Sequence, residues 1–119
     1  VACELSDQVH VVDVQNRSVK SVIKAGKRAN GLAMTPDGER LFVSNGGDAS
    51  VMVVDTSRDE VVAVIAVGQR PWNMAVTPDG DKLYVANGRS NSVTVVDARR
   101  LVRLKEIKVG NLPWGVAIR

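Results

Sequence analysis

The sequence has very few of the residue types on which most catalytic and metal sites depend. Its 119 residues include one cysteine, Cys3, and one histidine, His10. A single thiol excludes an internal disulfide, and without a CxxC or CxxCH motif neither a zinc knuckle nor covalent haem attachment is supported. A lone histidine cannot complete a histidine-based triad or a multi-histidine metal site. We therefore predict no catalytic set, no metal site and no bound cofactor.

Other absences reduce the number of possible partners but do not identify the compartment. No apolar run approaches the eighteen or so residues that a membrane helix needs, so no membrane span is predicted. Aromatic residues supply only 3% of the chain, and without a basic and aromatic platform nucleic acid is not an expected partner. The sequence begins at Val1 and contains no signal-peptide motif, which leaves the compartment open.

The net charge of +3 is distributed unevenly. Residues 1–84 carry nine Lys/Arg against eleven Asp/Glu, whereas residues 85–119 carry seven against two. A basic end can meet an acidic partner or a membrane surface. The alternative is that it forms a solvated outer strand.

Valine dominates the apolar residues, and an internal repeat organises them. A fixed offset of forty-two residues places Val1–Asp13, Val43–Asp55 and Val85–Asp97 in register. About sixteen of the forty-two positions match between the first two copies. A period in the low forties is typical of four-stranded propeller blades, which defines repeats 1–42, 43–84 and 85–119 within a single domain.

Each repeat predicts four short strands. In the best-formed copies these are residues 72–77, 82–87, 93–97 and 60–67, separated by polar loops. The first hairpin contains the tetrapeptide TPDG at Thr35–Gly38 and again at Thr77–Gly80. Proline, aspartate and glycine in that order favour a tight turn. No window shows helical periodicity, so the predicted fold class is all-β.

Several predicted strands are apolar on consecutive residues, as in "SVMVVD" at Ser50–Asp55 and "VVAVIAV" at Val61–Val67. This pattern indicates burial on both faces, which one blade cannot achieve alone. We therefore predict a β-propeller of four-stranded antiparallel blades, with about three blade equivalents in this chain.

The motifs "LYVAN" at Leu83–Asn87, "LFVSN" at Leu41–Asn45 and the recurring "VVD" resemble the YVTN family of β-propeller repeats. The resemblance covers essentially the whole chain. It implies a bacterial or archaeal protein of the periplasm or cell surface. Copy one departs from the pattern, because Cys3 replaces the motif asparagine and Ala29–Asn30 stand where the other copies have Pro-Trp.

Three blades are too few to close a propeller, which typically has four to eight. Two completions are open. Either the chain is part of a longer propeller, or two copies form a homodimer of six blades by strand exchange about a twofold axis. In the second case residues Trp114–Ile118, predicted to form an innermost strand, would complete the first blade of the partner.

Five residues are candidates for ligand binding. Trp72 and Trp114 occupy equivalent positions at the start of the innermost strand, with Asn30 as the third member. The resemblance places this end near a mouth of the central channel, where two indoles would offer a platform; the alternative is that they wedge between blades. Arg28 and Arg70 align in the preceding loop and would bind a carboxylate or phosphate, unless they are simply solvated.

Other polar residues are expected to be structural. Short side chains at strand ends and turns most often bond the nearby backbone. This group comprises Asp13, Asp37, Gly38, Asn45, Asp55, Asp79, Gly80, Asn87 and Asp97. His10 and Cys3 are expected to be partly buried structural residues, with no assigned role.

Two classes of function remain open. The first is a non-catalytic binding or scaffold module that uses its channel-mouth loops to hold a protein or small ligand. The alternative, from the family resemblance alone, is a component of a bacterial quinoprotein or haem-linked oxidoreductase system, or a lactonase-like propeller enzyme. The absence of a recognisable catalytic set favours the first.

Overall fold

The computed structural model describes all residues from 1 to 119 and contains eleven strands and no helix. The strands are β1 (Ala2–Cys3), β2 (Gln8–Asp13), β3 (Ser18–Lys24), β4 (Ala29–Met34), β5 (Arg40–Asn45), β6 (Ser50–Asp55), β7 (Glu60–Ala66), β8 (Pro71–Val76), β9 (Lys82–Asn87), β10 (Ser92–Asp97) and β11 (Val102–Lys108). The predicted all-β class is confirmed. The structure offers no helix with the length and apolar character to cross a membrane.

Consecutive strands pair antiparallel in three separate sheets. The first sheet has the order β1-β2-β3, and the second and third have four strands each, β4-β5-β6-β7 and β8-β9-β10-β11. The ladder between the last two strands of every sheet shifts register at the valine pair of the VVD motif, as between Val53 and Val54. Such bulges increase the local twist of a strand, which suits a blade.

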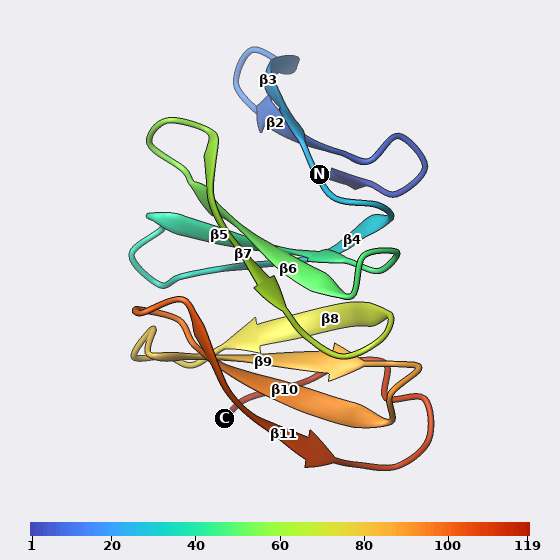
Figure 1. Ribbon diagram of the computed structural model, residues 1–119. Coiled ribbons are helices and arrows are strands. Elements are labelled where there is room, and N and C mark those ends of the chain that lie inside the picture. Colours follow the sequence, from blue (N-terminus) through green and yellow to red (C-terminus); the bar gives the residue numbers. More distant parts are fainter.

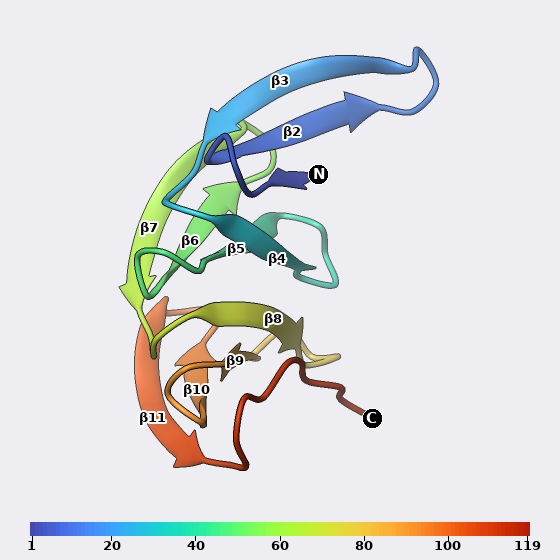
Figure 2. The same ribbon diagram turned by 90° about the vertical axis from the view of Figure 1, so that its right-hand side faces the viewer.

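The three sheets stack face to face in chain order, from the N-terminal sheet to the C-terminal sheet (Figure 1). Figure 2 shows the outermost strands on an outer arc, with β3 across the top and β7 and β11 down the left, and the inner strands β4 and β8 inside that arc. Both chain ends lie on the inner side. This is the arrangement of adjacent propeller blades around an axis near β4 and β8.

The hydrophobic core lies between the sheets rather than within one of them. One cluster joins the second and third sheets and contains Phe42, Val53, Leu83 and Val85, all fully buried. A smaller cluster, which includes Val9 and Val54, joins the first and second sheets. Burial on both faces of the second sheet explains why its strands are apolar on consecutive residues.

The C-terminal segment differs from its sequence prediction. Residues 113–119 form no strand, although Trp114–Ile118 were expected to be an innermost strand. The segment follows β11 directly and has no neighbouring strand with which to form a ladder. Local β propensity is not enough without a partner for the backbone hydrogen bonds.

Candidate functional site

The two ends of the strands carry different kinds of loop. At one end lie the loops that join one sheet to the next, at residues 25–28, 67–70 and 109–113, together with the turns at 4–7, 46–49 and 88–91. We name this the connector end. The other end, here the hairpin end, carries only turns within a sheet. All five ligand-binding candidates of the sequence lie on or beside the connector end.

Side chains from the neighbouring turns hold the connector loops in place. The backbone amide of Lys27 donates to Asp48 Oδ2 at 2.7 Å, and that of Arg28 donates to Asp7 Oδ1 at 2.7 Å. The same contact recurs from the Leu112 amide to Asn91 Oδ1 at 2.9 Å. The first connector is therefore fixed to the turns on either side of it, and the third to the turn at 88–91.

Arg28 and Arg70 occupy unusual backbone positions, with φ of 56° and 54°. A non-glycine residue in this left-handed region costs free energy unless the surroundings impose it. The structure repeats this conformation at every connector, since Leu112 has φ of 51°. The side chains at these positions are consequently presented from rigid loops.

The two arginines meet at one carboxylate, that of Glu4. Its Oε1 lies 3.4 Å from Arg70 Nη2 and 3.7 Å from Arg28 Nη1. Its Oε2 accepts a hydrogen bond from Asn30 Nδ2 at 3.4 Å. The structure thus brings together three of the five candidates, Arg28, Asn30 and Arg70, from two connectors and the strand β4.

Glu4 itself was missed by the sequence interpretation. It occupies the position that is glycine in the other copies, Gly46 and Gly88. A charged residue at a position that is otherwise glycine was a detectable signal.

The two tryptophans are in contact. The ring centroids of Trp72 and Trp114 lie 4.4 Å apart with an interplanar angle of 48°. Trp72 is half-buried and Trp114 is 71% exposed, so the pair forms an exposed aromatic surface and is not wedged between sheets. Gly88 makes room for it, because a Cβ there would lie 2.3 Å from a Trp72 ring carbon.

A buried hydroxyl fixes the backbone beneath the tryptophans. Ser44 Oγ accepts from the Gly31 amide at 2.8 Å and donates to the Trp72 carbonyl at 2.7 Å. A Cβ at position 31 would lie 2.1 Å from that carbonyl oxygen, so only glycine allows β4 and β8 to approach this closely. The innermost strands therefore hold the two parts of the cluster in a fixed relation.

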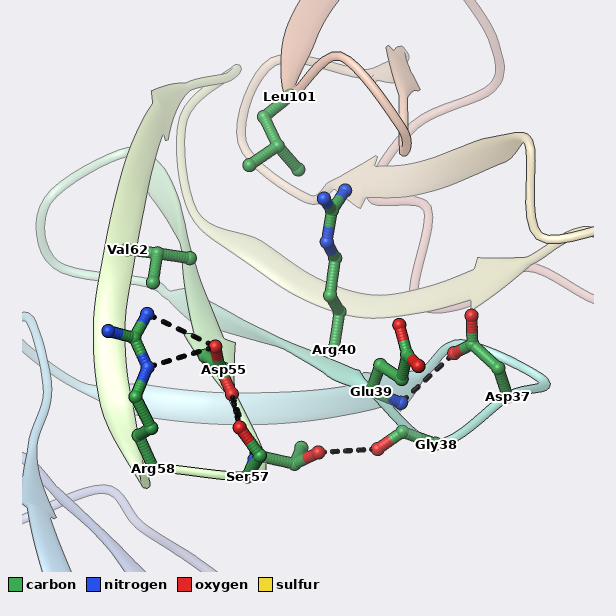
Figure 3. A pocket seen from close by; sticks show the side chains of 10 residues that line it. Asp37, Gly38, Glu39, Arg40, Asp55, Ser57, Arg58, Val62 and Leu101 are labelled. Atoms are coloured by element: carbon green, nitrogen blue, oxygen red, sulfur yellow. Dashed lines mark hydrogen bonds and ion pairs between the residues drawn. The ribbon is translucent and has the colours of Figure 1, made fainter.

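The hairpin end contains a pocket of about 580 Å³, which Figure 3 shows. Its polar side chains are paired with one another: Arg58 with Asp55, and Thr56 Oγ1 with the Gly38 carbonyl at 2.5 Å. Arg40 donates to the carbonyls of Ala98 and Arg99, each at 2.9 Å. These contacts join the sheets and shape the turns around the pocket.

The turn aspartates bond the backbone and hydroxyls around them. Asp37 Oδ1 accepts from the Glu39 amide at 3.0 Å, and Asp79 Oδ1 accepts from the Asp81 amide at 2.9 Å. Hydrogen bonds from Thr35 and Thr77 lower the pKa of Asp37 and Asp79 respectively. The same holds for the strand-end aspartates, whose pKa values are lowered by hydrogen bonds chiefly from Asn16, Ser57 and Arg100 to Asp13, Asp55 and Asp97.

Asn45 and Asn87 differ from expectation in their partners. Asn45 Nδ2 donates to Ser50 Oγ at 3.2 Å, and Asn87 Nδ2 donates to Ser92 Oγ at 3.1 Å, so the partners are side chains and not the backbone. Both residues are fully buried, and their Oδ1 atoms have no hydrogen-bond partner. Gly68 permits this packing, since a Cβ there would lie 2.6 Å from the Asn87 amide.

The remaining polar candidates form no site. His10 Nε2 lies 3.1 Å from Gln8 Oε1 on the same strand, and Cys3 is a half-buried free thiol. No three metal-ligating side chains converge in the structure. The connector-end cluster of Glu4, Arg28, Asn30, Arg70, Trp72 and Trp114 is therefore the candidate site.

Comparison with known proteins identifies one family. The sequence model described as "Lactonase, 7-bladed beta-propeller" matches residues 1–109. No curated protein matches the chain.

Solved structures give the same architecture. Hydrazine synthase from Kuenenia stuttgartiensis is 29% identical with a TM-score of 0.88, over 92% of this chain and 32% of that one. The dihydro-heme d1 dehydrogenase NirN, in complex with DHE, is 26% identical with a TM-score of 0.78, over 90% and 23%. AztD from Citrobacter koseri, at 20% identity and a TM-score of 0.78 over 92% and 31%, shares the fold. The chain spans about a third or less of the length of these structures.

Proposed function

Because the chain belongs to the family of seven-bladed lactonase β-propellers, we propose that it is one segment of a larger propeller that serves as a component of a haem-linked oxidoreductase system. The two solved structures above 25% identity, a hydrazine synthase and a dihydro-heme d1 dehydrogenase, support this function better than a non-catalytic scaffold. We further assign its repeats to the YVTN class and its compartment to the periplasm or cell surface, on the motifs at Leu41–Asn45 and Leu83–Asn87.

The connector-end cluster is the observation that carries the proposal. Two arginines from separate loops converge on the carboxylate of Glu4, and at the same end of the sheets two tryptophans contact each other. Cationic and aromatic groups that converge at the end of a rigid scaffold are typical of ligand-binding sites. This surface would receive a redox ligand or the face of a haem protein, while the electron-transfer chemistry resides in the haem.

The experiment is purification of the protein from its natural host under mild conditions, followed by native electrophoresis with haem staining. A haem-protein band that co-migrates with the propeller supports the proposal, and mass spectrometry of that band identifies the partner as an oxidoreductase subunit. A propeller that migrates free of any haem protein would contradict it.

Lactone hydrolysis is a second candidate, favoured by the family match alone. It predicts acid release from a simple aliphatic lactone at a rate above the buffer blank. An arginine variant at the connector end, Arg70→Gln, would lower that rate if the same surface bound the lactone. The two candidates are distinguishable because the first requires a haem-containing partner and the second does not.

The remaining blades belong, in our proposal, to the same polypeptide. A homodimer of two such three-blade segments would give six blades, whereas the family has seven and the solved structures have chains about three times as long. Equivalent residues also differ in exposure between sheets. Ile65 is 6% exposed between two sheets, whereas its counterpart Ile107 is 39% exposed on the outer face of the third sheet. A further blade packed there would bury it.

A further inference from the structure

The charges in the connector-end cluster do not balance. Arg28 and Arg70 together carry two positive charges, and Glu4 is the one carboxylate that pairs with either of them. A guanidinium has five N–H donors in a fixed fork, so a single carboxylate cannot satisfy two of them. Apart from Glu4, neither guanidinium has a hydrogen-bond or ion-pair partner. Most of their donors therefore remain free for a second anion.

The contacts to Glu4 are long. The 3.4 and 3.7 Å separations exceed the 2.7–2.9 Å of a strong charge-assisted hydrogen bond. Glu4 is 36% exposed and Arg28 is 56% exposed at their side chains, so this pairing is solvated and weak. The Glu4 carboxylate is consequently a weak counter-ion of the two arginines, and an anion that pairs with them better would displace it from the guanidinium groups.

The aromatic surface formed by Trp72 and Trp114 is joined to Arg70 by the chain itself. Arg70 is followed by Pro71 and Trp72, so one short segment carries both a guanidinium and an indole. Gly88 and the Ser44 hydrogen bond fix Trp72, and Trp114 extends the aromatic surface toward solvent. Indole faces bind flat π systems by stacking.

From this arrangement we propose that the connector end binds a planar aromatic acid, of which one carboxylate takes the position of the Glu4 carboxylate between Arg28 and Arg70 and the ring system extends to Trp72 and Trp114. Glu4 is the specificity residue of the site. The Glu4 carboxylate disfavours weak monoanions, because they must compete with a carboxylate that is already tethered at the site. A ligand that pairs with both arginines displaces it. This inference deepens the proposed function and rests on it only in taking the connector end as the binding end.

Titration calorimetry with naphthalene-2,6-dicarboxylate tests the proposal on the purified protein. The comparison ligands are 2-naphthylmethylammonium, which keeps the ring and reverses the charge, and inorganic phosphate, which is an anion without a ring. We expect measurable binding of the dicarboxylate and binding at least tenfold weaker for both comparison ligands, because charge-assisted pairs and ring stacking each contribute. Equal affinity for the ammonium compound, or no binding of the dicarboxylate, would overturn the assigned ligand class.

The variant Glu4→Gln distinguishes a counter-ion from a mere structural residue. Removing the competing charge is expected to tighten dicarboxylate binding about two- to fivefold, the range of an exposed ion pair. A variant that merely unfolds loses affinity, so a gain in affinity cannot be explained by a destabilised fold. Unchanged or weaker binding by Glu4→Gln would refute the role of Glu4.

Arg70→Gln and Arg28→Gln are each expected to weaken dicarboxylate binding roughly tenfold. Arg58→Gln, at the hairpin end, is the matched control and should leave binding unchanged. A loss that is as large in the control as in the connector-end variants would count against the site. These measurements contain no haem protein, so their failure and the failure of the proposed oxidoreductase role are separate results.

Discussion

At the residue scale, the three copies of the repeat carry different residues at the end of the turn that precedes the third strand. Asp7, Ala49 and Asn91 are equivalent and all adopt a left-handed backbone, with φ between 50° and 54°. Aspartate and asparagine tolerate this conformation better than alanine. The Asp7 and Asn91 side chains also accept a hydrogen bond from the connector amide twenty-one residues later. Ala49 adopts the left-handed backbone at a greater cost, and its methyl side chain cannot accept a hydrogen bond.

We predict that Ala49→Asn stabilises the protein. The new side chain would accept from the Arg70 amide, as Asn91 does from Leu112, and it would relieve the backbone cost at position 49. A gain of about 1 kcal/mol in the free energy of unfolding is expected. Urea denaturation measures it.

The glycine variant Ala49→Gly separates the two contributions. Glycine relieves the left-handed conformation but offers no acceptor, so it should gain less than asparagine. If the two variants are equally stable, the hydrogen bond to the Arg70 amide contributes nothing. If Ala49→Asn is less stable than the native protein, the equivalence of the three turns fails.

At the residue scale the regular repeat identified which residues are equivalent. The structure places Trp72 beside Trp114, and Arg28 and Arg70 beside the same carboxylate, while their role in ligand binding stays a prediction. Glu4 and Ser44 were missed because their roles depend on what lies across the sheet interface. Sequence periodicity specifies which residues are equivalent but not which residues of adjacent blades touch.

At the scale of elements, strand prediction was accurate and its one failure has a clear cause. The predicted strands at residues 82–87 and 60–67 correspond to β9 and β7 within one residue. Consecutive apolar residues between polar turns were enough for this. Residues 114–118 have the same local character but no ladder, because strand formation requires a partner that local sequence does not contain.

The TPDG turns between strands also make the stability of the fold depend on pH. Hydrogen bonds from Thr35 and Thr77, followed by backbone amides, lower the pKa of Asp37 and Asp79 below the ordinary value of 3.8. A carboxyl whose pKa is lower in the folded state stabilises the fold above the unfolded value, and this stabilisation is lost as the pH falls through the folded value. The nearby cation of Lys82 lowers the pKa of Asp79 further.

We predict that the midpoint of thermal unfolding is constant from pH 7 to about pH 5 and falls below about pH 4. The double variant Asp37→Asn/Asp79→Asn should reduce the slope of this fall, because asparagine keeps an acceptor oxygen but does not titrate. Scanning calorimetry between pH 7 and pH 2.5 measures the effect. An identical slope in the native protein and the double variant would rule out these two turns as its source.

At the scale of the whole molecule, the outer faces of the sheet stack are its most informative feature. Ile23, Ile65 and Ile107 are equivalent, and the first two are 6% exposed whereas Ile107 is 39% exposed. On the other face Val54 and Val96 are buried at 1% and 0%, whereas their counterpart Val12 is 43% exposed. The same sequence position is thus buried or exposed according to whether a sheet covers it.

This comparison leads to a test of the complete propeller. If another blade covers the third sheet in the whole protein, Ile107→Asp would bury an unpaired carboxylate and destabilise the protein by about 2–4 kcal/mol. Val64→Asp is the matched control. Val64 remains 64% exposed although sheets lie on both sides of its own, so the change there should stay within about 0.5 kcal/mol.

Urea denaturation of both variants, together with the native mass from light scattering, distinguishes the two ways of closing the ring. A large effect at Ile107 with the mass of one polypeptide supports blades on the same chain. The same effect with a mass of twice 12.8 kDa would instead establish the six-bladed homodimer. Equal, small effects at Ile107 and Val64 would mean that nothing covers the third sheet, and the exposed isoleucine would then belong to an open surface rather than to a blade interface.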